Sequence, residues 1–392
     1  MQPPTGLTVA ADVPDPRVFP ERVEATFALQ VDRAAASLAS SSASGADQYD
    51  GLVTSDMARA LSAGNGMWLA GLLGAAPSAA VARQLWRELV SAWDHATRSE
   101  QGAVGVTLFA MPIVIVAARA DDGAASRLEG ALPDSGRLRA ILLEHGALAG
   151  NRSFALANGL AASDAIDVPR LPQLLTWTRL PDSTASAPLH EVEPAPVQLI
   201  AGEQTVHLRF IIGTALAAPG APLLADSRVG GWGVPFAQEL ARQLSPAELT
   251  VLALPRAPRS PLLALHEGRT AQREVGAQLF ASNAIRRLRA SVGEPSAVIS
   301  AHRCPTALGG GELRLSLSSV FDSRQAEGFR CPLFTPERVG DVAAVLLDLL
   351  HDCRVTDVHV LSGVYPDRDP RTGLTLLFKA EALAEATPTP LQ

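Results

Sequence analysis

Residues 336–352 read PERVGDVAAVLLDLLHD, and this stretch has the clearest secondary-structure pattern in the chain. Thr335, just before it, can cap a helix with its hydroxyl, and Pro336 suits the first helical position because no amide donor is needed there. The stretch therefore predicts an amphipathic helix from about Pro336 to Asp352. Its apolar residues recur every three or four positions and form one stripe: Val339, Val342, Ala343, Leu346, Leu349, Leu350 and Cys353.

Strand patterns lie on both sides of this helix. Apolar and polar residues alternate over Glu312–Ser318, over Val355–Leu361 and over Leu374–Lys379. Ser296–Cys304 also has an extended character. This order of elements predicts a mostly antiparallel sheet covered by helices in the C-terminal half.

Helical patterns dominate the first half of the chain, so the predicted fold class is α+β. The strongest is Ser78–Ser99, where Val81, Leu85, Leu89 and Trp93 lie along one side. Further helices are predicted at residues 21–40, 55–62, 137–145 and 151–162, with a polar loop at 41–50.

The most apolar run is Val104–Ala118. It predicts a buried strand, or two short strands that meet at Pro112. It is too short to cross a bilayer comfortably, so no membrane insertion is predicted. The N-terminus lacks a basic start followed by an apolar core, so we expect a cytoplasmic protein without a signal peptide.

The length of 392 residues favours two domains. Residues 1–20 carry five prolines and predict an extended arm, and 21–180 predict a mostly helical domain. Residues 181–196 carry four prolines among Ser, Thr, Ala and acidic residues and predict a linker, with a long surface loop inside one domain as the alternative. Residues 197–380 then form an α+β domain, and 381–392 a flexible tail.

Composition excludes several chemistries. With 47% hydrophobic and 19% charged residues the chain can bury a core. Lys379 is the only lysine, so there is no phosphate-loop lysine, and a Schiff-base enzyme would depend on that one residue. No cofactor is predicted. The net charge of -7 argues against a general nucleic-acid coat, although a local basic patch remains open.

Cysteine and histidine gather in the C-terminal half. His302 and Cys304 are two residues apart on a predicted strand and share a face, so with Cys331 they form a weak candidate zinc site. Cys304 or Cys331 is also a weak candidate for a catalytic thiol. No CxxC pair is present and Cys353 lies on the apolar helical stripe. We therefore favour packing for these residues and predict no metal site.

A cluster of arginines follows at residues 256–289. Its members are Arg256, Arg259, Arg269, Arg273, Arg286, Arg287 and Arg289. Arginine forks suit phosphates and carboxylates, so Arg256, Arg259, Arg286 and Arg289 are weak candidates for binding nucleic acid, a nucleotide or an acidic partner. Phe280 is the only aromatic residue nearby, and a solvated helix face is the favoured interpretation.

A last cluster is Arg314, Asp357 and His359, on the polar faces of predicted strands. It is a weak acid–base candidate, with ordinary surface ion pairs as the favoured alternative. Three functional hypotheses result. The first is a non-catalytic protein-interaction or assembly protein with an unidentified protein partner. The others are an enzyme or zinc-dependent protein that uses the C-terminal Cys/His/Arg region, and a binder of nucleic acid or a phosphorylated ligand at Arg256–Arg289.

Overall fold

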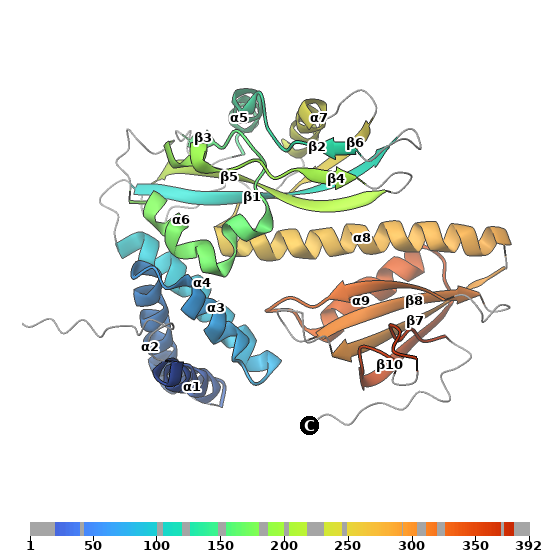
Figure 1. Cartoon of the computed structure of the whole chain (residues 1–392), viewed down its shortest axis with the longest axis horizontal. Helices are drawn as coiled ribbons and strands as arrows, with labels where there is room; N and C mark the ends of the chain where they lie inside the picture. The colour runs from blue at the N-terminus through green and yellow to red at the C-terminus, as the bar shows by residue number, and fades with distance from the viewer. Residues whose placement is uncertain are drawn as a thin grey trace, which may run out of the picture.

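The structure is a computed structural model (Figure 1). It describes residues 20–39, 43–99, 105–119, 126–147, 154–179, 187–199, 204–217, 231–244, 249–291, 293–303, 311–319, 326–369 and 372–379. Within these ranges it contains two four-stranded sheets with the long helix α8 (Pro261–Ser291) between them. The predicted α+β class, with a mostly helical first half, is confirmed.

The first sheet has the strand order β3-β5-β1-β6 and is antiparallel. Its strands are β1 (Gly105–Arg119), β3 (Phe154–Leu156), β5 (Thr205–Ala217) and β6 (Leu249–Pro255). Helices α5 (Ser135–Glu144) and α7 (Gly233–Leu244) cover one face, and α8 lies on the other (Figure 1). A short β2 (Ser126–Leu128) pairs with β4 (Val197–Leu199) beside them.

The N-terminal helices pack against the α8 side of this sheet. They are α1 (Pro20–Ala39), α2 (Ala43–Ser62), α3 (Gly66–Gly74) and α4 (Ala79–Ser99). Short helices η1 (Ser163–Ile166), η2 (Val168–Arg170), α6 (Leu171–Trp177) and η4 (Ala187–Glu191) contribute to the same core. The predicted helix at 78–99 is confirmed, because its four marked residues are all buried.

The second sheet has the strand order β10-β7-β8-β9. Its strands are β7 (Pro295–Arg303), β8 (Gly311–Ser319), β9 (Glu327–Pro332) and β10 (Asp357–Tyr365). The β7–β8 and β8–β9 pairs are antiparallel, and β10 runs parallel to β7. Helix α9 (Val339–Asp352) and the second half of α8 cover its apolar face.

Helix α9 begins three residues later than predicted. Arg338 is its first capping residue, while Thr335 and Pro336 lie in the preceding turn. The Glu337 carboxylate accepts a hydrogen bond from the Phe334 amide at 2.9 Å, which fixes this turn. Of the predicted stripe, Val342, Leu346 and Leu350 are buried, whereas Val339 at its start is exposed.

Three local predictions were wrong. Residues 151–162 contain β3 rather than a helix, because Phe154–Leu156 pair with β5. Residues 374–379 form an isolated bridge, Arg368 to Thr375, in place of a strand. Helix α2 already begins at Ala43, inside the predicted loop.

The apolar run at 104–118 forms one continuous strand, β1, through Pro112. The Pro112 carbonyl accepts from the Arg256 amide at 2.8 Å, just past the end of β6. In an antiparallel pair the amide and carbonyl of one residue point toward the same neighbouring strand. The hydrogen bond that Pro112 cannot donate would therefore go to the residue just past β6, where the pairing with β6 ends. This position explains why the proline does not split the strand.

The first sheet draws strands from both sides of residues 181–196. Strands β1 and β3 precede this segment, and β5 and β6 follow it. Its last residues are tied down, because Arg209 donates from Nε to the Ala195 carbonyl at 3.1 Å and from Nη2 to the Pro196 carbonyl. The main-chain pairing therefore crosses the predicted linker, whose residues 181–186 lie outside the described ranges. Residues 1–19 of the predicted arm at 1–20 and the predicted tail at 381–392 also lie outside them, while Pro20 begins α1.

None of the helices in the described ranges has both the length and the hydropathy of a membrane span. The longest, α8, instead carries apolar residues toward both sheets.

Gly268 sets how closely α8 approaches the first sheet. A Cβ at this position would lie 2.8 Å from Leu208 Cδ1, 3.0 Å from Pro112 Cβ and 3.1 Å from Phe210 Cζ. We therefore expect Gly268→Leu to lower the free energy of unfolding by about 1–3 kcal/mol, measured by chemical denaturation.

The matched control is Gly340→Leu in α9, where a Cβ would meet nothing within 4 Å. Its stability should equal or exceed that of the wild type, because leucine favours helix more than glycine does. Equal stability of the Gly268→Leu variant and the wild type would contradict this close approach.

Candidate functional site

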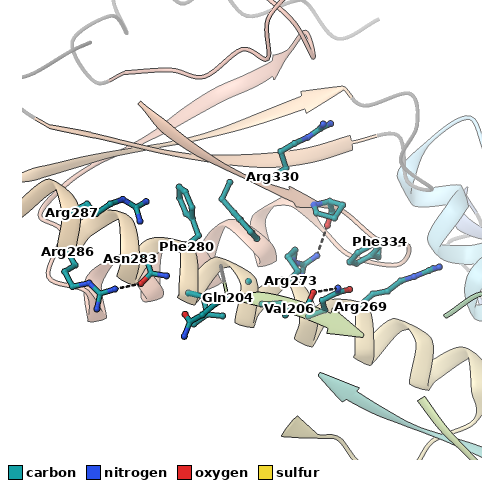
Figure 2. A pocket seen from close by; sticks show the side chains of 15 residues that line it. Gln204, Val206, Arg269, Arg273, Phe280, Asn283, Arg286, Arg287, Arg330 and Phe334 are labelled. Carbon is teal, nitrogen blue, oxygen red and sulfur yellow. Dashed lines mark hydrogen bonds between the residues drawn. The ribbon is translucent and has the colours of Figure 1, made fainter. Parts of the chain in front are cut away.

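A large cavity among the described residues is a groove along the second half of α8. It has a volume of about 860 Å³ and runs between α8, the start of β5 and strand β9 (Figure 2). We call it the α8 groove. Its lining residues are Gln204, Val206, Arg269, Gln272, Arg273, Gly276, Leu279, Phe280, Asn283, Arg286, Arg287, Phe329, Arg330, Pro332 and Phe334.

The groove lies along the part of α8 that leaves the first sheet and packs against the second. Its first turns bury Leu262 and Leu265 under the first sheet, and its later turns bury Ala281 and Ile285 under the second. From Arg269 to Arg287, partly alongside the contact with the second sheet, one side of the helix is left uncovered. The side chains on that uncovered side line the groove.

Positive charge dominates the lining. Five arginines contribute to it, and within the described ranges none of the lining residues carries a carboxylate. Four of the arginines pair with carboxylates beyond the groove wall: Arg269 with Asp167 at 2.9 Å, Arg273 with Glu337, Arg287 with Glu327 and Arg330 with Glu312 at 2.9 Å.

Arg286 differs from the other four. Its guanidinium is exposed and donates to Asn283 Oδ1 at 2.6 Å, one turn earlier on α8 (Figure 2). Among the described residues it makes no ion pair. Of the five described arginines in the groove, Arg286 is the one whose positive charge is not paired with a carboxylate. The neutral Asn283 side chain fixes its position.

Arg273 and Glu337 form a buried ion pair that fixes one end of the groove. Arg273 donates to the two oxygens of Glu337 at 2.5 and 2.7 Å, and to the Pro332 carbonyl at 2.9 Å. Both side chains are less than a tenth exposed. The pair ties α8 to the turn before α9 and to the end of β9.

The Glu337 carboxylate is held ionised by its donors. Burial alone would raise its pKa, but hydrogen bonds from Arg273, the Phe334 amide and Thr270 outweigh that effect and lower the pKa below its usual range. Thr270 donates from Oγ1 at 2.9 Å.

Aromatic rings from separate elements meet inside the groove. Phe280 on α8 and Phe329 on β9 are stacked, with ring centroids 5.5 Å apart and an interplanar angle of 26°. Figure 2 shows Phe280 directed from the helix toward the strand. At the other end Phe334 lies beneath two guanidinium groups, 5.8 Å from Arg269 and 5.5 Å from Arg273.

Arg330 lies on the rim, and its guanidinium is turned away from α8 (Figure 2). There it joins a polar cluster on the opposite face of the second sheet. The centre of that cluster is Arg314, fully buried, which donates to Glu312 at 2.6 Å and to the Asp367 and Leu376 carbonyls at 2.6 and 2.9 Å. It also pairs with the Asp367 carboxylate, so it holds the segment after β10 on the sheet.

Of the four arginines chosen from sequence, only Arg286 lines the α8 groove. Arg256 and Arg259 follow β6, where their amides bond to the carbonyls of Pro112 and Ala110. Arg289 points to the end of α9 and donates to the carbonyls of Cys353 and Arg354 at 3.2 and 3.0 Å.

Arg314, Asp357 and His359 are not brought together as one cluster. Asp357 and His359 form an exposed pair on β10, with 2.9 Å between Oδ1 and Nε2. Strand β7 separates β10 from β8, which carries Arg314. Asp357 lies beside Ser296 of β7 and Arg314 beside Ser300, so the two also lie four residues apart along that strand.

The predicted zinc ligands do not converge in the described part of the chain. Cys331 packs in the apolar core on the helix-covered face of the second sheet, whereas the His302 ring lies on the other face with Tyr365 and Phe378. Cys304 lies outside the described residues. Within those residues no group of three His, Cys, Asp or Glu side chains is placed to hold a metal ion.

His302 is instead bound by neighbours within the sheet. Its Nδ1 lies 2.8 Å from the Pro366 carbonyl, which only accepts, so Nδ1 carries the proton and Nε2 accepts from Ser300 Oγ at 2.8 Å. Burial lowers the pKa of His302. Both residues are only 1% exposed, so the pair is enclosed within the described part of the sheet.

Comparison with protein-family models, with curated proteins and with solved structures found no match for this chain.

Sequence reasoning missed the aromatic half of the groove. It noted Phe280 alone, because Phe329 and Phe334 lie about fifty residues later in the chain. The signal available was the strand β9 itself, which the sequence pattern also missed. Once that strand is paired with β8, Phe329 faces α8 and its ring fills the space beside Gly276.

The Arg273–Glu337 pair makes stability depend on pH. Because the pKa of Glu337 is lower in the folded chain than in the unfolded chain, its contribution is complete above the unfolded value of about 4.3 and is lost as the pH falls. We expect Glu337→Gln to cost about 3–5 kcal/mol at pH 7, because it leaves Arg273 buried without its counter-charge.

Denaturant unfolding from pH 7 down to pH 3 measures both effects. Below about pH 4.3 the wild type should lose more stability than Glu337→Gln, so the two curves converge. The control is Glu129→Gln, whose side chain is 71% exposed and which should change stability by less than about 0.5 kcal/mol. Parallel pH curves for wild type and Glu337→Gln would contradict the assignment.

Cys331 is fully buried, and burial raises its pKa to about 12. At pH 8 the thiolate is then on the order of one molecule in ten thousand, so the thiol should be unreactive. We expect iodoacetamide to label Cys331 far more slowly in the native protein than in the unfolded chain, by peptide mass spectrometry. Cys353, which is partly exposed, is the internal control, and fast native labelling of Cys331 would restore the catalytic-thiol hypothesis.

Proposed function

We propose that this protein is a binding protein that holds an anionic ligand in the α8 groove. The observation that carries the proposal is Arg286, an exposed guanidinium held in position by Asn283 and without a counter-charge among the described residues. Arginine in this state binds phosphate or carboxylate through two parallel hydrogen bonds. The described groove lining contains no carboxylates that would repel an anionic ligand.

Arg287 supports the same conclusion. It follows Arg286 on α8, and its side chain is 59% exposed although it pairs with Glu327. Surface ion pairs of this kind contribute about 0–1 kcal/mol, so an incoming anion exchanges with Glu327 at little cost. The two arginines together present a basic end to the groove, while the Arg273–Glu337 pair keeps the other end rigid.

This proposal selects among the hypotheses from sequence. It corresponds to the binder of a phosphorylated or nucleic-acid ligand, and it agrees with an interaction protein whose partner supplies the anionic group. A reducing compartment such as the cytoplasm remains our proposed location, because Cys331 and Cys353 are both free thiols.

Inorganic polyphosphate tests anion binding without any organic group. We expect calorimetric titration to detect binding that weakens as salt is added, and Arg286→Ala to weaken it about tenfold, or 1.4 kcal/mol.

The matched control is Arg289→Ala, which removes the same charge from the same helix outside the groove. Its affinity for polyphosphate should stay close to that of the wild type. Equal losses in the two variants would show a response to net charge alone and would contradict a site at Arg286.

A further inference from the structure

We infer that the anionic ligand of the α8 groove is single-stranded nucleic acid. This inference rests on the proposed function and names the ligand class for the same site. It starts from the three kinds of side chain that line the groove together, because each kind matches a different part of a nucleotide.

The end of the groove that carries Arg286 and Arg287 is suited to binding phosphate groups. Arg286 and Arg287 are adjacent on α8, and both are exposed. From Arg286 the groove runs back along α8 to Arg269, which is 19% exposed and pairs with Asp167. Arg286 and Arg269 are separated by 17 positions, or about 25 Å along the helix axis. That length suits the lower end of known single-strand sites, about four nucleotides.

The phenylalanine rings in the groove are suited to stacking with nucleotide bases. Phe280 and Phe329 are both partly exposed, and they stack on one another at 5.5 Å across the middle of the groove. A flat apolar platform between basic residues is what a strand with unpaired bases requires, since each base has a ring face to stack. A duplex hides these faces inside its own stack, so the platform favours a single strand.

Base edges match the amide side chains. Gln204, Gln272 and Asn283 line the groove, and the Gln272 amide already donates to the Val206 carbonyl at 3.2 Å. Asn283 gives its carbonyl oxygen to Arg286, so its amide group remains a donor, and Gln204 is exposed at the start of β5. Such groups bond to the Watson–Crick edges of splayed bases.

An acidic protein segment fits fewer of these features. Its carboxylates would bind the arginines, but they have no flat face to stack on the exposed parts of Phe280 and Phe329. The net charge of -7 also limits binding to this local surface, so we expect a short, salt-sensitive site in place of a nucleic-acid coat.

The test compares three labelled or competing probes on the full chain. They are an eight-nucleotide thymidine strand, an abasic strand with the same number of phosphates, and poly-glutamate. By fluorescence anisotropy at low salt the thymidine strand should bind on the order of tenfold more tightly than the abasic strand. Phe280→Ala should abolish that difference and leave abasic binding unchanged.

Two further variants complete the design. Phe280→Leu keeps an apolar side chain of similar bulk, so it tests the flat ring even where Phe280→Ala does not fold. Arg286→Ala should weaken both strands and reduce the slope of log K against log salt by about 0.7, whereas Arg289→Ala should do neither.

The outcomes separate the two proposals. Equal affinity for thymidine and abasic strands, with polyphosphate still bound through Arg286, overturns the nucleic-acid ligand and leaves the anion groove standing. Tighter binding of poly-glutamate than of either strand overturns it in favour of an acidic protein partner. Failure of every anion to bind overturns the inference and the proposed function together.

Discussion

Helix α8 must satisfy two sheets at once, and the rest of the structure depends on that constraint. Its apolar residues face the first sheet near Leu262 and Leu265 and the second near Ala281 and Ile285. Gly268 permits the close approach to the first sheet, and Arg273 anchors the turn that leads into α9. The groove is the uncovered side of this shared helix.

The second sheet is unusual in burying polar side chains on one of its two faces. Ser300, His302, Glu312 and Arg314 are each no more than 3% exposed, and the segment after β10 covers them. Polar groups are buried at low cost only when they are hydrogen-bonded, which Arg314 achieves with two carboxylates and two carbonyls. Glu312 is shared with Arg330, so this covered layer and the rim of the groove have a carboxylate in common.

The sequence was sufficient for elements whose periodicity is set by one neighbouring surface. Helix α4 and the stripe of α9 were predicted for that reason. It was insufficient where an element serves two neighbours. Strands β7 and β8 are buried on both faces, and the polar residues on the second face could not be recognised as interior.

The candidate site was only partly predictable for a related reason. Its arginines lie on one helix and were visible as a cluster. Which of them meet in a groove depends on β9 and on the start of β5, more than forty residues away in either direction. No local pattern distinguishes Arg286, which faces the groove, from Arg289, which caps α9.

The Arg314 cluster also bears on how much of the chain this fold requires. A protein shortened to end before Asp367 would lose the segment that covers this face of the second sheet, and Arg314 would lose its second carboxylate and the carbonyls of Asp367 and Leu376. Hydrogen bonds of a charged group contribute about 1.5–3 kcal/mol each, so their combined loss is large against the whole stability of many domains. Residues 366–369 and 372–378 therefore act as an integral layer of the second sheet, and C-terminal truncation should be tolerated only beyond residue 378.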